Sequence, residues 1–145
     1  MLEVGDASEI AEGTALKLSE RSFTPEDVTA FCALTGDAAD IHQQGELQIV
    51  PGAMLLSAVA SYLQGALRVL NASHAVLAKI DDARFPASLV AGHACRFEGT
   101  VRRVRSHSGA TYVTVAVTCT DVTSGDTVMS LDVTDAYLSR DGSHI

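Results

Sequence analysis

One stretch constrains the fold more than any other: the run from Ala53 to about Leu70 is rich in Met, Leu, Ala and Val and carries few charges. A helix that is apolar on nearly every side is buried inside a protein. The wider run over residues 49–70 is interrupted by Pro51, Gln64, Gly65 and Arg68, so it is too broken to span a bilayer. The sequence therefore predicts one long helix that is enclosed by the rest of the chain.

The pattern changes from helix to strand after this run. Two short strands are expected at residues 75–80 and 83–89, the second interrupted by Pro86. Three longer stretches alternate between apolar and polar residues, as half-buried strands do, over residues 94–105, 111–121 and 128–138. Turn residues at 106–109 and 123–126 join these three strands into an antiparallel meander.

A shorter helix is expected before the buried one. Thr24 can cap it, Pro25 suits its first position, and Gly36 is a fitting stop. Residues 14–21 predict a first strand, residues 1–13 a loosely organised lead-in, and residues 37–48 an irregular polar loop.

These elements indicate an α+β fold in which an antiparallel sheet wraps around one long central helix. A chain of 145 residues with 47% apolar composition is large enough for one core, so residues 1–145 are expected to form a single domain. The outer face of the sheet and its edges then remain available for pairing with a second copy.

Charge and cysteine content exclude several classes of function. The net charge of −8 argues against binding of nucleic acid. Cys32, Cys95 and Cys119 have no metal-ligand or disulfide spacing and are expected to be small core residues. The N-terminal sequence lacks the basic start and apolar centre of a signal peptide, so a cytoplasmic protein is expected.

The one basic cluster consists of Arg102, Arg103 and Arg105, within a predicted strand. Its simplest interpretation is a solvated strand face. The alternative is a surface that receives the phosphate of a carrier or coenzyme.

The candidate site is the loop from Gly36 to His42, together with Pro51 and Gly52 at the start of the buried helix. Asp37 and His42 lie five residues apart in this loop, so both side chains can reach one pocket. A carboxylate beside an imidazole can move protons in both directions near neutral pH. Gly52 lets a ligand approach the first amides of the helix, where a carbonyl would be polarised. Each element alone is typical of ordinary turns, but their order before a buried helix is much less common.

These motifs carry a resemblance to a known family. The segments 23–31, 34–37, 41–42 and 49–52 (FTPEDVTAF, LTGD, IH and IVPG) resemble the MaoC-like hydratases and dehydratases. The resemblance implies the hot-dog fold, a homodimer, and no metal or organic cofactor. It also implies addition of water to 2-enoyl thioesters of coenzyme A or acyl carrier protein, or its removal from 3-hydroxyacyl thioesters.

Matched by position, Asp37 and His42 correspond to the catalytic pair of that family, and Gly52 to the glycine whose amide holds the thioester carbonyl. Ser61 corresponds to a supporting serine if Ala53 is an insertion. The usual Asn-Pro of the loop is replaced by Ala39 and Asp40. Asp40 adds a carboxylate beside the pair and is a further candidate supporting residue.

The stretch between His42 and Gly52 is also shorter than in the family, which predicts a more open acyl pocket. These changes favour a specialised substrate, such as one of polyketide metabolism. Which of Asp37 and His42 is the acid and which the base stays open at this point. Two other functions remain: a thioesterase or cyclase with the same fold, and a non-catalytic binding or dimerisation subunit.

Overall fold

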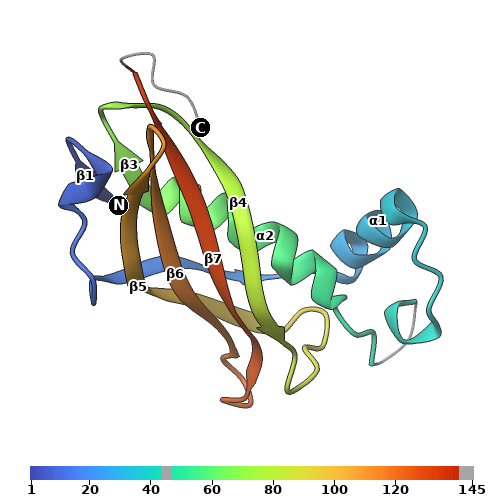
Figure 1. Cartoon of the computed structure of the whole chain (residues 1–145). Helices are drawn as coiled ribbons and strands as arrows, with labels where there is room; N and C mark the ends of the chain where they lie inside the picture. The colour runs from blue at the N-terminus through green and yellow to red at the C-terminus, as the bar shows by residue number, and fades with distance from the viewer. Residues whose placement is uncertain (44–46, 141–145) are drawn as a thin grey trace.

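A five-stranded antiparallel sheet dominates the computed structural model, which describes residues 1–43 and 47–140 (Figure 1). The strand order is β2-β5-β6-β7-β4. The strands span β2 (Ala15–Ser22), β4 (Ala72–Arg84), β5 (Ala94–His107), β6 (Ala110–Asp121) and β7 (Thr127–Ser139). The predicted meander is confirmed, because β5, β6 and β7 pair in sequence order.

The strand before the meander differs from the prediction. Residues 72–84 form one continuous strand, β4, that pairs with β7 at the edge of the sheet. The separate strand expected at residues 83–89 is wrong, since strand β4 ends at Arg84 and Phe85 and Pro86 lie outside it. Proline fixes φ and removes an N–H donor, so it cannot continue a hydrogen-bonded strand.

The predicted buried helix is α2 (Gly52–Ala66), which packs on the inner face of the sheet. It buries Met54, Leu55, Val59, Leu63 and Ala66. These residues join one core with the inward side chains of the strands, among them Phe97, Val115 and Val133.

Helix α2 is shorter and less enclosed than expected. It ends at Ala66, because residues 67–69 form β3 (Leu67–Val69), which pairs in parallel with β1 (Leu2–Val4). The lead-in expected to be loose therefore contributes a strand, followed by the 3₁₀ helix η1 (Ala7–Glu9). One side of α2 also reaches solvent, through the small or polar residues Ala53, Ser57, Ser61, Gln64 and Gly65.

The first helix, α1 (Pro25–Thr35), follows its predicted signals. The Thr24 hydroxyl accepts a hydrogen bond from the Asp27 N–H at 3.1 Å, and the Asp27 carboxylate accepts one from the Thr24 N–H at 3.0 Å. Gly36 ends the helix with a φ of 77°. In Figure 1, α1 lies outside the sheet, near the N-terminal end of α2.

All three cysteines are buried and free, as predicted. No helix among the described residues is both long enough and apolar enough to cross a membrane.

Candidate functional site

The loop between α1 and α2 begins with a sharp reversal that positions Asp37. The left-handed conformation of Gly36 turns the chain, and the Asp37 N–H donates to the Cys32 carbonyl at 3.0 Å. One oxygen of the Asp37 carboxylate, Oδ1, accepts a hydrogen bond from the Ala39 N–H at 3.0 Å. This side-chain-to-backbone turn holds the carboxylate in place and leaves Oδ2 for another partner.

The loop then forms the 3₁₀ helix η2 (Asp40–His42). This turn places the His42 side chain near that of Asp37. His42 Nε2 lies 3.8 Å from Asp37 Oδ2, and the side chains are 14% and 32% exposed, respectively. This distance is longer than a direct hydrogen bond. The structure therefore brings the two residues together as a proximal pair that is open to solvent on the Asp37 side.

A second contact defines the orientation of the imidazole. His42 Nδ1 lies 2.8 Å from the Ile49 carbonyl oxygen, which can only accept, so Nδ1 carries a proton. In the neutral ring the lone pair is consequently on Nε2, the atom that faces Asp37. The pair thus has a lone-pair nitrogen and a carboxylate oxygen facing each other, 3.8 Å apart.

Two hydrogen bonds join η2 to residues 48–49, just before α2. The Ile49 N–H donates to the Ile41 carbonyl at 2.7 Å, and the Gln48 side-chain amide donates to the His42 carbonyl at 3.1 Å. Gln48 is buried, so the second bond is shielded from water. The shortened segment expected here includes residues 44–46, which lie outside the described residues.

A cavity of about 220 Å³ lies beside His42. It is lined by His42, Ile49, Val50, Gly52, Leu55, Phe85, Ala87, Ser88, Leu89 and Val128, most of which are apolar residues. His42 and Gly52 therefore share one cavity, as expected, whereas Asp37 lies behind His42 and does not line it.

Gly52 is the first residue of α2, where backbone amides have no partner within the helix. The helix dipole adds partial positive charge at this end. A carbonyl oxygen in the cavity can therefore accept a hydrogen bond from this terminus, and negative charge that develops on it would be stabilised.

Phe85 explains why residue 52 is glycine. A β-carbon built on Gly52 would lie 2.8 Å from Phe85 Cε1, closer than real carbon contacts. Backbone hydrogen bonds join the segments that carry the two residues: the Val50 N–H donates to the Leu89 carbonyl and the Ala91 N–H to the Gln48 carbonyl. Sequence reasoning missed the role of Phe85, because its contact with Gly52 joins residues far apart in the sequence.

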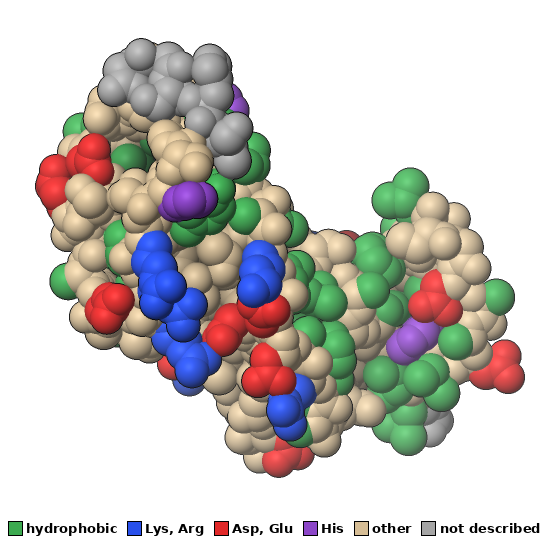
Figure 2. All heavy atoms as spheres, viewed as in Figure 1, with side chains coloured by type: hydrophobic (Ala, Val, Ile, Leu, Met, Phe, Trp, Pro, Cys, Tyr) green, Lys and Arg blue, Asp and Glu red, His purple; other side chains and the backbone are tan. Residues whose placement is uncertain are grey.

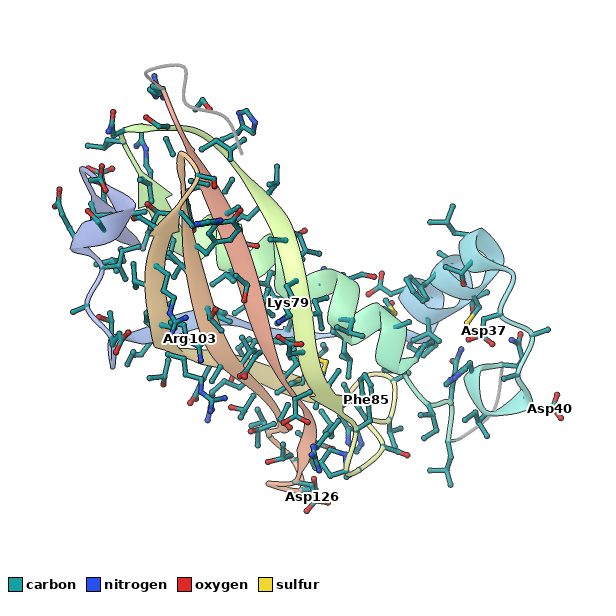
Figure 3. All side chains as sticks on the ribbon, in the orientation of Figure 1. Asp37, Asp40, Lys79, Phe85, Arg103 and Asp126 are labelled. Atoms are coloured by element: carbon teal, nitrogen blue, oxygen red, sulfur yellow. The ribbon has the colours of Figure 1, made fainter. Side chains whose placement is uncertain are left out.

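Two further candidates are not brought into the site. Asp40 is exposed at the outer edge of the loop, while Asp37 lies on its inner side (Figure 3). Within the described part of the chain, no hydrogen bond or ion pair joins the Asp40 carboxylate to His42. Ser61 is exposed on α2, nine positions after Gly52, and is not among the residues that line the cavity.

A second histidine–carboxylate pair lies elsewhere. His93 Nδ1 is 3.2 Å from Asp121 Oδ2. Burial raises the pKa of Asp121, but hydrogen bonds from His93 and from the Thr123 and Ser124 amides outweigh it and lower that pKa. The pairing joins the ends of β5 and β6 and does not touch the cavity, so it has the features of a structural contact.

No group of three or more His, Cys, Asp or Glu side chains in residues 1–43 and 47–140 is placed to hold a metal ion.

Of the comparisons with known proteins, the one with solved structures gives matches, and these agree on the fold. No protein-family model matches the sequence, and no curated protein is significantly similar to it. Among solved structures, a monoamine oxidase regulatory protein of Archaeoglobus is similar with a TM-score of 0.76 at 18% identity, covering 94% of this chain and 95% of its own. The unliganded (R)-hydratase PhaJ1 of Pseudomonas aeruginosa has a TM-score of 0.75 at 14% identity, with 94% and 87% covered.

A MaoC-like dehydratase from Rhodospirillum rubrum is similar at the same level, with a TM-score of 0.73, 14% identity, and 92% and 96% of the two chains covered. At these identities the likeness concerns the fold, and it extends over almost the whole of each chain. The resemblance found in the sequence is thus confirmed at the level of the fold: this chain has the hot-dog fold of the (R)-hydratases and MaoC-like dehydratases.

Proposed function

We propose that this protein is a hydratase or dehydratase of an acyl thioester and a divergent member of the MaoC-like family. The observation that carries the proposal is the arrangement at the cavity. His42, with its base nitrogen facing Asp37, shares a cavity with the free N-terminal end of α2 at Gly52. Reversible addition of water to a Cα–Cβ double bond needs a base, an acid and a site for the carbonyl oxygen. We propose His42, Asp37 and the Gly52 end of α2 for these three roles.

The positions of the two residues suggest their roles in elimination. The α-carbon of the substrate is bonded to the carbonyl carbon, so it would lie near Gly52 and hence near His42, which lines the same cavity. His42 Nε2 takes the α-proton, and the Cα–H electron pair becomes the new double bond. Asp37 lies outside the cavity wall but 3.8 Å from His42, so the β-hydroxyl would have to extend past His42 to reach it. There Asp37, protonated, donates its proton to the leaving β-hydroxyl, which departs as water. Proton exchange across the 3.8 Å pair then restores the starting state.

The Gly52 end of α2 would contribute by stabilising charge. Removal of the α-proton places negative charge on the thioester oxygen, and a hydrogen bond aimed there is stronger in the transition state than in the bound substrate. The ring of Phe85 lies against Gly52 and forms part of the cavity wall.

The cavity favours a short acyl chain. Its volume of about 220 Å³ lies below the ~300–1,000 Å³ typical of sites for drug-sized ligands. We propose a short enoyl or 3-hydroxyacyl group carried by coenzyme A or acyl carrier protein. A cytoplasmic role in specialised acyl metabolism, such as polyketide tailoring, is part of this proposal.

The proposed active form is a homodimer that pairs through β4. This strand lies at an edge of the sheet, and Leu77 and Ile80 on its inner face are 45% and 37% exposed. Paired residues point to the same side of a sheet, and Leu77 and Ile80 pair with Asp135 and Val133, whose side chains are buried. A second copy would cover these apolar side chains and satisfy the open strand edge.

The test is turnover of 3-hydroxybutyryl and crotonyl thioesters of coenzyme A and of acyl carrier protein, followed by the enoyl absorbance. Asp37→Asn and His42→Gln are each expected to lower kcat at least 100-fold. Asp40→Asn, in the same loop, and His93→Gln, in the other histidine pair, are matched controls expected to stay within about threefold of the wild type. Lack of turnover on every substrate refutes the proposal, and release of free thiol without a change at Cα–Cβ identifies a thioesterase instead.

A further inference from the structure

The outer face of the sheet holds a second cavity, on the side away from α2. Its volume is about 370 Å³, and residues of β4, β5, β6 and β7 line it. The wall consists of Lys79, Asp81, Arg102, Arg103, Arg105, His107, Tyr112, Thr114, Asp132 and Thr134, and we call this set the outer groove. Figure 2 shows Lys and Arg side chains gathered in a column on this face.

A β-bulge brings the arginines together. Val101 pairs with Val115 and Arg103 with Thr114, so Arg102 is an extra residue without a partner on β6. Strict alternation would place Arg103 and Arg105 on the opposite face from Arg102. The bulge resets the alternation, and all three guanidinium groups therefore line the same groove.

The groove concentrates positive charge in an acidic protein. Four of the ten lysines and arginines of the chain line it, against only two carboxylates, although the chain as a whole carries a net charge of −8. The two carboxylates are already engaged: Asp132 accepts from Arg102 at 2.7 Å, and Asp81 lies 3.1 Å from Lys79. Among the described residues, Arg103 and Arg105 have no ion-pair partner.

Hydroxyl groups lie between the cationic side chains. Arg103, Thr114, Thr134 and Lys79 pair across β5, β6, β7 and β4 in one row, so they share the outer face. The hydroxyls of Thr114 and Thr134 are 2.8 Å apart, and Figure 3 shows Arg103 and Lys79 on the strands at either side of the row. Arginine forks with neighbouring hydroxyl donors match the geometry of phosphate oxygens.

We propose that the outer groove binds the phosphate group of a small phosphorylated ligand. Charged residues are depleted at the centre of protein–protein interfaces, whereas six of the ten residues that line this groove are Lys, Arg or Asp. A volume of about 370 Å³ also suits a small molecule. The sheet separates the groove from the His42 cavity, because the groove residues face away from the core that packs on α2. This site is therefore distinct from the proposed hydratase site and does not depend on that activity.

Calorimetric titration with pyrophosphate and with ADP tests the proposal. Wild-type protein is expected to bind both saturably in 50 mM salt and more weakly in 200 mM salt. The double variant Arg103→Gln/Arg105→Gln is expected to weaken binding at least tenfold, because charge-assisted hydrogen bonds to phosphate are lost. Arg96→Gln, on the same strand but outside the groove, is the matched control and is expected to bind as the wild type does.

A gain of affinity provides an independent test that does not rely on the double variant folding. Asp132→Asn releases Arg102 from its ion pair and raises the charge of the groove, so it is expected to tighten pyrophosphate binding severalfold. Tighter binding of ADP than of pyrophosphate would identify a nucleotide as the source of the phosphate, and equal binding a simpler phosphate ester.

Three results overturn the proposal: no saturable binding of either compound, equal binding by the double variant, or unchanged binding by Asp132→Asn. Binding of an acyl carrier protein without its phosphopantetheine, lost in the double variant while pyrophosphate does not bind, would assign the groove to an acidic protein surface instead.

Discussion

Asp135 provides the sharpest test of the packing around the core. Its side chain lies on the inner face of β7, is 1% exposed, and has no hydrogen-bond partner for either carboxylate oxygen among the described residues. Its register partners are Val113 and Leu77, which offer no compensating charge. Burial therefore raises the pKa of Asp135 from 3.8 to about 6. Burial also raises the pKa of Tyr137, and the nearby charge of Asp135 raises it further.

The consequence is a loss of stability as pH rises. Below pH 4 the carboxyl is protonated in both the folded and the unfolded state, so it contributes no pH dependence. Between pH 4 and 6 the folded state holds the proton more tightly than the unfolded state, and the free energy of unfolding falls. A pKa difference of about two units corresponds to ~3 kcal/mol of lost stability above pH 6.

Asp135→Asn removes the charge and keeps the shape. The advantage of Asn over Asp in the free energy of unfolding is expected to be about 3 kcal/mol larger at pH 8 than at pH 4, or roughly 6–12 °C in Tm. Urea unfolding of both proteins at the two pH values measures this difference. Asp132→Asn, on the outer face of the same strand, is the control and is not expected to gain stability at pH 8. An equal effect of Asp135→Asn at both pH values would refute the reasoning.

Three further perturbations test the site, the core and the assembly. Gly52→Ala places a β-carbon 2.8 Å from Phe85 Cε1, so we expect at least a tenfold loss of kcat/KM with an unchanged circular dichroism spectrum. Wild-type kcat/KM in this variant would contradict that account. Val59→Ala leaves a cavity at a fully buried position of α2 and is expected to cost about 2 kcal/mol in urea unfolding, against almost nothing for Ser57→Ala on the exposed side. Leu77→Lys is expected to convert a dimer to a monomer in light scattering, and a dimeric variant would exclude pairing through β4.

Local signals explain why much of the fold could be predicted. The cap at Thr24, the stop at Gly36 and the alternation of the three meander strands depend on residues close in sequence, and all are confirmed. The end of α2 could not be predicted in the same way. Leu67 and Val69 are apolar enough to continue a helix, but they form a strand because β1, more than 60 residues earlier, pairs with them.

In the candidate site too, features set by nearby residues could be predicted, whereas features set by long-range contacts could not. The spacing of Asp37 and His42 and the position of Gly52 were readable, because they lie in one loop and at one helix start. The Ile49 carbonyl that orients His42 and the Phe85 ring over Gly52 depend on long-range pairing of the loop segments, which leaves no local pattern. The pairing of His93 with Asp121 was missed for this reason, since 28 residues separate them in the sequence.

The sequence by itself determined which residues are candidates for the proposed chemistry: an aspartate, a histidine and a glycine, ordered before an apolar helix, and a run of arginines within a strand. Only the tertiary structure decided how those residues act. Strand register decides which side chains face one another, and a single bulge moves every later side chain to the other face. The bulge at Arg102 places three arginines on the outer face of the sheet. Strict alternation along the sequence would have predicted Arg103 and Arg105 on the opposite face from Arg102.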